Sequence, residues 1–290
     1  MRRQPLISVI VSAFNAEATI ASAIRSILRQ SVSEFELLIA DDGSTDRTLA
    51  TIREFDDPRI TVLSDGRNLG MARRLNEMID RARGEYIARM DADDLMMPRR
   101  LETQLDFLRG QPEVDVVDSG AYIAWPGSGV VGKRVAPLHV TAVRALDSGL
   151  LIHPAVMAVA DWFRSHRYSA RFLRGQDREL WARSLRDTTF ARVPQPLIVY
   201  FDNPESSHAM YRANMRSGRR TIRLHGPNLI GPVATAALLS RSCLKETFHR
   251  VSHTFGIRTS LYARRNEALS CDEHRFVTDW CRQCGRMFDQ

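Results

Sequence analysis

Apolar residues follow two different repeats in the first part of the chain. Short, nearly continuous apolar runs alternate with stretches whose apolar residues recur every three or four positions, as at Ile20, Ile24 and Ile27. The runs are typical of strands buried on both faces, and the spaced residues are typical of helices with one buried face. The four clearest runs span residues 6–12, 35–40, 60–63 and 85–90. Strands that alternate with helices in this way predict an α/β fold with a mostly parallel sheet.

The alternation weakens after about residue 130. We expect a further strand at 155–160, a broken pair of strands at 190–201 and a helix at 176–186. From residue 207 onward the pattern is helical and rich in arginine. This part of the sequence predicts a helical C-terminal appendage and not an independent domain.

The composition narrows the class of protein. Of the 290 residues, 44% are hydrophobic and 26% are charged, which argues against a disordered, collagenous or coiled-coil chain. No apolar run approaches the roughly 18 residues of a membrane-spanning helix. The N-terminal run is short and is interrupted by Ser8 and Ser12, so it predicts a first strand and not a signal peptide. The default expectation is a cytoplasmic protein.

The formal net charge is +7, and the excess of basic residues lies after residue 110. Lys133 and Lys245 are the only lysines. A coding preference for arginine is the simpler interpretation of this bias. The alternative is an anionic partner for the C-terminal third: nucleic acid, an anionic membrane or a phosphorylated substrate. Nucleic acid is the weakest of these, because aromatic residues are not interleaved with the basic ones.

Two acidic clusters directly follow predicted strands. Asp41 and Asp42 follow the second strand, and Asp91, Asp93 and Asp94 follow the fourth. In a parallel sheet these positions share one edge, and ligands bind at that edge. Three carboxylates within four residues repel one another, and a hard divalent cation such as Mg²⁺ or Mn²⁺ would neutralise them. The alternative is that these side chains cap the helices that follow.

Four sequence blocks occur in order through this region. They are ISVIVSAFNAEATI, FELLIADDGSTDRT, GRNLGMARRLN and GEYIARMDADD. Together they resemble glycosyltransferase family 2 over about residues 6–125, and a weaker similarity continues at 152–157 and 175–185. The resemblance implies the GT-A fold, which is a Rossmann-like, mostly parallel sheet with flanking helices. It also implies an enzyme that transfers a sugar from a nucleotide sugar.

The resemblance implies an organisation and roles for individual residues. Residues 1–125 would form the nucleotide-sugar-binding half, 126–205 the acceptor-binding half of the same domain, and 206–290 the basic helical appendage. A divalent cation, Mn²⁺ or Mg²⁺, would be held by Asp93 and Asp91 and would bridge the donor diphosphate. The residues expected to bind the nucleotide sugar are Ala13, Phe14, Glu17, Asp42, Arg67, Asp91 and Asp93. Of these, the first two would line the base, and Asp42 would accept a hydrogen bond from it.

The block GQDRELW at 175–181 resembles the part of the family that carries the catalytic base. Asp177 aligns with the carboxylate that removes the proton of the acceptor hydroxyl. Gln176 stands where family members commonly have an acidic residue. Glu179 is a second candidate base, although helical spacing points it elsewhere, and capping of the helix is the structural alternative for Asp177. Family members invert the anomeric centre, so no covalent enzyme intermediate is expected.

The implied acceptor is a glycan or a lipid-linked sugar, in bacterial surface polysaccharide synthesis at the inner face of the plasma membrane. A basic helical face at 212–223 would suit peripheral contact with an anionic membrane, although a solvated face is the simpler interpretation. A catalytically inactive member that only binds a nucleotide sugar or glycan is one alternative. A nucleotidyltransferase is another, but the segment SAFNAEATI lacks the glycine-rich loop that such enzymes usually have after the first strand.

A few other residues could carry chemistry. His153 could face the acceptor or be a buried turn histidine, and the loop with Ser206, Ser207 and His208 could close over the diphosphate. Four residues near the C-terminus could supply zinc ligands, although the short gap between the two pairs favours free thiols. They are Cys271, His274, Cys281 and Cys284.

Overall fold

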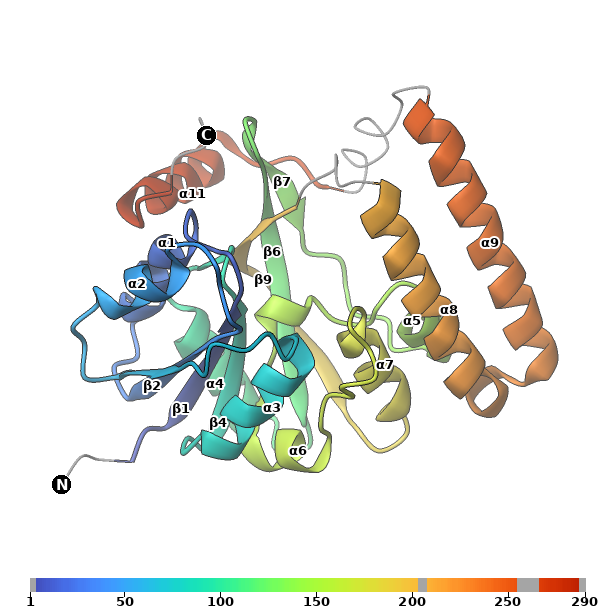
Figure 1. Ribbon diagram of the computed structural model, residues 1–290, viewed down its shortest axis with the longest axis horizontal. Helices are drawn as coiled ribbons and strands as arrows, with labels where there is room; N and C mark the ends of the chain where they lie inside the picture. Colours follow the sequence, from blue (N-terminus) through green and yellow to red (C-terminus); the bar gives the residue numbers. More distant parts are fainter. Residues whose placement is uncertain (1–3, 203–207, 255–265, 287–290) are drawn as a thin grey trace.

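The computed structural model describes residues 4–202, 208–254 and 266–286. Within them the chain builds a nine-stranded sheet in the order β3-β2-β1-β4-β8-β6-β9-β5, with β7 paired to β6 (Figure 1). One hydrophobic cluster lies on each face of the sheet, and smaller clusters lie under the loops and the C-terminal helices.

The first half of the sheet is parallel. Its strands are β1 (Ile7–Ala13), β2 (Phe35–Asp41), β3 (Ile60–Leu63) and β4 (Tyr86–Asp91). All three pairings among them are parallel. The helices between and after them are α1 (Ile20–Leu28), α2 (Thr48–Arg53), α3 (Met71–Arg81) and α4 (Arg100–Gly110). The predicted α/β class and parallel order are therefore confirmed in this half.

The second half of the sheet is mixed. Antiparallel β8 (Met157–Val159) joins β4 to β6 (Val116–Trp125), and β6 runs parallel to β9 (Phe190–Phe201). The expected broken pair at 190–201 was wrong, because β9 is one strand of 12 residues. Its register against β6 shifts around Gly120, opposite the stretch with Pro194 and Pro196. Prolines cannot donate to the ladder, which explains why the pattern suggested a break.

Short elements complete the body of the molecule. The strands are β5 (Leu95–Met96), which pairs with β9, and β7 (Gly129–Arg134). The helices are α5 (Ala142–Asp147), α6 (Ala160–Ser165) and α7 (Gln176–Arg183), and a 3-10 turn spans His153–Ala155.

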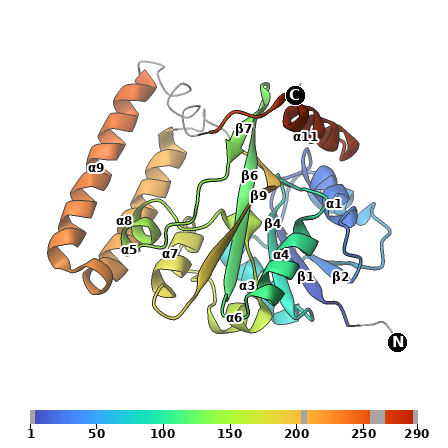
Figure 2. The ribbon, with the colours of Figure 1, turned by 180° about the vertical axis from the view of Figure 1, so that it is seen from behind.

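The C-terminal helices lie in two separate places (Figures 1 and 2). α8 (His208–Ile230) and α9 (Pro232–Thr254) stand side by side at one end, next to α5 and α7. α11 (Cys271–Gln283) lies at the opposite end, near α1 and β7. There Trp280 Nε1 donates to the Met96 carbonyl at 2.8 Å, so the last described helix packs on the sheet body.

Among the helices in the described ranges, none combines the length and the apolar character needed to cross a lipid bilayer.

Candidate active site

The carboxyl ends of β1, β2 and β4 open into a large cleft of about 1800 Å³. Residues from both halves of the sheet line it. The lining includes six of the residues expected from the sequence: Phe14, Glu17, Asp42, Asp91, Asp93 and Asp177. Chain segments that are far apart in sequence therefore place these six side chains around one space.

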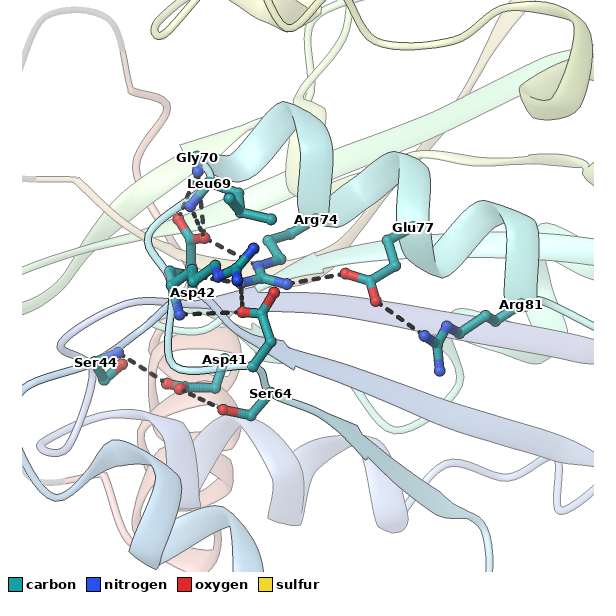
Figure 3. A network of polar contacts seen from close by, with 11 residues as sticks. Asp41, Asp42, Ser44, Ser64, Leu69, Gly70, Arg74, Glu77 and Arg81 are labelled. Carbon is teal, nitrogen blue, oxygen red and sulfur yellow. Dashed lines mark hydrogen bonds and ion pairs between the residues drawn. The ribbon is translucent and has the colours of Figure 1, made fainter.

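Asp42 is held by the turn at the start of α3 (Figure 3). Its Oδ1 accepts the Leu69 N–H at 2.7 Å, and its Oδ2 accepts the Gly70 N–H at 2.9 Å. Arg74 Nε donates to Oδ1 at 3.0 Å. Gly70 has a φ of 84°, which favours glycine at this point of the turn. The alternative that Asp42 caps α2 was wrong, because that helix begins at Thr48 without a side-chain cap.

The loops after β1 and β2 are tied to each other. Asn15, with a φ of 49°, accepts the Thr45 N–H at 2.9 Å, and Glu17 accepts the Arg47 N–H at 2.8 Å. Neither side chain caps α1, which begins after Thr19. Phe14 is 49% exposed at the mouth of the first strand, and its neighbour Ala13 is buried beneath. The phenyl ring is therefore available as a flat apolar wall of the cleft.

Three carboxylates gather at the end of β4. Oxygen atoms of Asp91, Asp93 and Asp94 lie within 4.8 Å of one another. Asp94 is buried, and its Oδ1 accepts the Phe201 N–H at 2.9 Å, whereas its Oδ2 has no hydrogen-bond partner among the described residues. Capping of α4 by these side chains was wrong, since α4 begins after Arg99 without a side-chain cap. We call Asp91, Asp93 and Asp94 the acidic triad.

The acidic triad has an unusual charge balance. Burial and the neighbouring Asp91 raise the pKa of Asp93 to about 6, while Arg89 and Arg286 act in the opposite direction. Burial, followed by Asp93 and Asp91, also raises the pKa of Asp94 well above its usual range. The carboxyl groups of Asp93 and Asp94 therefore hold their protons more strongly than an isolated aspartic acid does, and a nearby positive charge would favour their ionised forms. This is the electrostatic situation that a divalent cation resolves.

A buried arginine lies beneath the acidic triad. Arg89 is 2% exposed and donates from Nη2 to Asp91, and its Nε and Nη1 have no hydrogen-bond partner within the described ranges. Nη2 also lies 3.6 Å from Met71 Sδ, and Gln176 Nε2 lies 3.0 Å from the same sulfur atom. Gln176 thus packs into the floor of the cleft instead of standing free beside Asp177.

His153 belongs to the same floor. It lines the cleft, and its Nε2 lies 2.8 Å from the Tyr168 hydroxyl. Burial and the Arg89 charge lower the pKa of His153 well below its usual range, so the ring is neutral at physiological pH. His153 thus stands in a turn, as one interpretation expected, and it also borders the cleft, while contact with the acceptor stays a prediction.

Asp177 and Glu179 point in different directions from the start of α7. Asp177 lines the cleft, and α7 begins after Gly175 without a side-chain cap, so the capping alternative was wrong. Glu179 is 3% exposed and forms ion pairs with Arg183 at 3.0 Å and with His225 at 3.2 Å. The expectation that Glu179 faces elsewhere is confirmed.

The other candidates are less involved in the cleft. The Arg67 side chain is exposed and is not part of the cleft lining, although its carbonyl accepts from Arg74 at 2.6 Å. Ser206, Ser207 and the side chain of His208 lie outside the described residues.

Cys281 and Cys284 are buried free thiols in an apolar cluster, whereas Cys271 is exposed. Within the described parts of the chain the acidic triad is the only group placed to hold a metal ion, so zinc at the C-terminal cysteines is not supported.

Two residues near the cleft were not expected from the sequence. Arg89 interrupts an apolar strand pattern, and a charged residue at a buried strand position is a signal that could have identified it. The second is Arg286, near the C-terminus. Its guanidinium lies 4.2 Å from the centre of the Phe201 ring, and its Nη1 donates to the Ala18 carbonyl at 3.5 Å. No local pattern indicates that contact.

Comparison with known proteins agrees with this geometry. A family profile described as "Glycosyl transferase family 2" matches residues 8–139. The chain is 36% identical over 190 residues to EpsE of Bacillus subtilis (strain 168), covering 63% of this chain and 68% of EpsE. It is 31% identical over 188 residues to the Escherichia coli protein named UDP-Glc:alpha-D-GlcNAc-diphosphoundecaprenol beta-1,3-glucosyltransferase WfgD, covering 65% of this chain and 73% of WfgD.

Solved structures show the same architecture. The mannosyltransferase PcManGT from Pyrobaculum calidifontis, in complex with GDP-Man and Mn²⁺, superposes with a TM-score of 0.63 at 16% identity, covering 98% of this chain and 86% of that chain. S. aureus TarS 1–349 in complex with UDP gives a TM-score of 0.59 at 19% identity, covering 82% and 70%. At these identities the likeness concerns the fold, and the fold is GT-A.

The architecture and the cleft thus define a sugar-transferring enzyme of the GT-A class. The chain belongs to glycosyltransferase family 2.

Proposed function

We propose that this glycosyltransferase binds a nucleotide-diphosphate sugar at the ends of β1, β2 and β4 and transfers the sugar, with inversion, to a hydroxyl of the acceptor. One observation carries the proposal: Asp177 from α7 lines the same cleft as Asp91 and Asp93. A donor site and a candidate base therefore face one space, from the two halves of the chain.

Different residues are proposed to bind the nucleobase and the diphosphate of the donor. Phe14 offers an apolar face for the base, and Asp42 Oδ2 accepts only the Gly70 N–H within the described ranges, so it can accept one more hydrogen bond from a base N–H. The acidic triad supplies oxygen ligands, and the unpaired Asp94 Oδ2 is an atom that a cation would satisfy. This donor set fits Mn²⁺ or Mg²⁺. Such a cation would stabilise the charge on the departing nucleoside diphosphate as a Lewis acid.

Asp177 is the proposed base. It forms no hydrogen bond or ion pair that would occupy its carboxylate among the described residues, and it lies on the cleft side of α7. It would remove the proton of the acceptor hydroxyl as that oxygen attacks the anomeric carbon. The bond between sugar and phosphate breaks, and its electron pair leaves with the nucleoside diphosphate. One displacement inverts the anomeric centre.

The acceptor is proposed to be a glycan or a lipid-linked sugar. The name of WfgD specifies an acceptor with a diphosphoundecaprenol carrier, and a comparable acceptor would place this enzyme in bacterial surface polysaccharide synthesis. Peripheral contact with the inner face of the plasma membrane would follow from such a substrate.

The test is a transfer assay on Asp177→Asn with a panel of UDP, GDP, CDP and dTDP sugars and Mn²⁺. We expect kcat to fall about a thousandfold with little change in donor affinity, because the variant keeps the shape but cannot take the proton. Asp161→Asn, at a side chain that is 84% exposed and paired with Arg164, is the matched control. Proton NMR of the product gives the anomeric configuration. Near-normal turnover in Asp177→Asn, or retained configuration, would contradict the proposal.

A further inference from the structure

The cleft has a second wall, opposite in charge to the acidic triad. It is formed by α5, the segment before α7, and α8, and none of the described residues that these three contribute to the lining is acidic. Asp177 stands next to it at the start of α7. We call its five arginines the arginine wall: Arg144, Arg171, Arg174, Arg216 and Arg220. We propose that the arginine wall binds a phosphate or diphosphate group carried by the acceptor. The inference rests on the proposed function, since it concerns the substrate that meets Asp177.

The pairing of arginines on α8 separates this wall from an ordinary charged surface. Arg212 and Arg219 form ion pairs with Glu246 of α9 at 3.3 and 2.7 Å. Arg216 and Arg220 lie on the face that lines the cleft, and within the described ranges neither pairs with a carboxylate. The same holds for the other three members of the arginine wall. Several uncompensated cations facing one space create a positive potential that attracts an anion.

The backbone under the arginine wall is held in place. Arg220 Nη1 donates to the Arg171 carbonyl at 2.8 Å, and its guanidinium lies 4.8 Å from the centre of the Phe172 ring. Ser217 Oγ donates to the Arg174 carbonyl. α8 therefore fixes the segment before α7, while the side chains of Arg171, Arg174 and Arg216 stay exposed to the cleft. A preformed site loses little conformational entropy when an anion binds.

The location favours the acceptor over the donor. The donor diphosphate is proposed to lie at the acidic triad, which follows β4, whereas the arginine wall comes from α5, the segment before α7, and α8. The arginine wall flanks Asp177, where the acceptor hydroxyl has to be. Leu173, between two of its arginines, is 86% exposed and reaches toward Gly70 at the donor turn. A group bound at the arginine wall would therefore hold the acceptor beside the donor sugar.

The chemistry favours phosphate. A guanidinium offers a planar pair of N–H donors that matches two phosphate oxygens, and several guanidiniums suit a compact group with more than one charge. Two acceptors carry such a group: a sugar on a lipid diphosphate and a glycan with phosphate substituents.

Isothermal titration in EDTA tests the proposal, since chelation prevents a diphosphate from binding through a metal at the acidic triad. The probes are geranyl diphosphate for the lipid carrier, glucose 1-phosphate for a phosphorylated glycan, and neutral octyl glucoside. The variants are Arg171→Ala, Arg174→Ala and Arg216→Ala; Arg220 is left in place because it also holds the backbone. Arg241→Ala, at an exposed arginine of α9 outside the cleft lining, is the matched control.

We expect at least one phosphate probe to bind more tightly than octyl glucoside, and the better one identifies the source of the phosphate. Each cleft variant should weaken that binding about fivefold or more, and Arg241→Ala should leave it unchanged. Equal binding of all three probes, or no loss in the cleft variants, would overturn the proposal.

Donor binding is measured in parallel, as the thermal shift produced by nucleotide sugar and Mn²⁺. Variants that keep this shift and lose the phosphate probe support an acceptor site. Variants that lose the donor shift to the same degree would assign the arginines to the donor and overturn the inference. If the wild-type protein shows no donor shift, the proposed function fails first, independently of the arginine wall.

Discussion

Arg74 Nε lies 3.0 Å from Asp42 Oδ1, and both side chains are almost fully buried. The same guanidinium also contacts Asp65 at 2.5 Å. Its contact with Glu77, at 3.0 Å, is seen in Figure 3. The carboxylate proposed to meet the nucleotide base is therefore oriented from α3, by a residue that does not line the cleft.

Arg74→Ala should destabilise the fold and weaken nucleotide binding together. Removing one partner of a buried ion pair leaves the Asp42 charge uncompensated, at a cost of about 3–5 kcal/mol in the free energy of unfolding. Urea denaturation measures the change in the free energy of unfolding. Titration with nucleotide, at temperatures where both proteins are folded, measures the change in affinity. Arg81→Ala is the control, at an exposed arginine whose one ion pair among the described residues is with Glu77, and it should change stability by less than about 1 kcal/mol. Unchanged stability in Arg74→Ala would contradict the role given to the pair.

Cation binding should depend on pH through Asp93. Its pKa is about 6 in the folded protein and 3.8 in the reference state, so the folded state holds a proton that the unfolded state releases between these values. The metal-free protein should therefore lose stability as the pH rises from about 4 to about 6, and Mn²⁺ affinity should increase as the pH rises through about 6.

Asp93→Asn removes this titrating group. Comparison of thermal midpoints for the metal-free wild type and variant, across that pH window, isolates the contribution of Asp93. A difference between the two proteins that does not vary with pH would show that Asp93 titrates outside the window.

Trp280→Phe should destabilise the protein. Trp280 is far in sequence from Met96, but it contacts this residue of the sheet in the fold. The substitution keeps most of the apolar packing but leaves the buried Met96 carbonyl without the indole N–H. A lost buried hydrogen bond of this kind costs about 1–3 kcal/mol. Phe276→Leu, at a side chain of α11 that is 54% exposed, should cost much less. Equal midpoints for both variants in denaturant would mean that α11 does not stabilise the body of the fold.

The parallel half of the sheet could be predicted because its signals are local. Each strand is a short apolar run, each helix carries its own apolar stripe, and the acidic residues follow directly after strands. The end of β4 could thus be predicted as a site from local signals. The sequence pattern did not show that Asp94 is buried while Asp93 is exposed, because the burial of Asp94 depends on β9 packing beside it.

The rest of the cleft depends on contacts between distant segments. Arg286 is close enough to lower the pKa of Asp93 only because α11 packs on β5 and β7. The arginine wall exists only because α8 turns one face toward the segment before α7. Helical spacing at 212–223 indicated a basic face, but it could not show that Glu246 neutralises one side and leaves the other toward the cleft.

The most direct test of the account is thermal stabilisation by UDP, GDP, CDP and dTDP sugars, each with and without Mn²⁺, in the wild type and in Asp93→Ala. We predict that one nucleotide raises the melting temperature only when Mn²⁺ is present, and that the shift disappears in the variant. No Mn²⁺-dependent shift with any nucleotide, or an unchanged shift in Asp93→Ala, would contradict the proposed donor site.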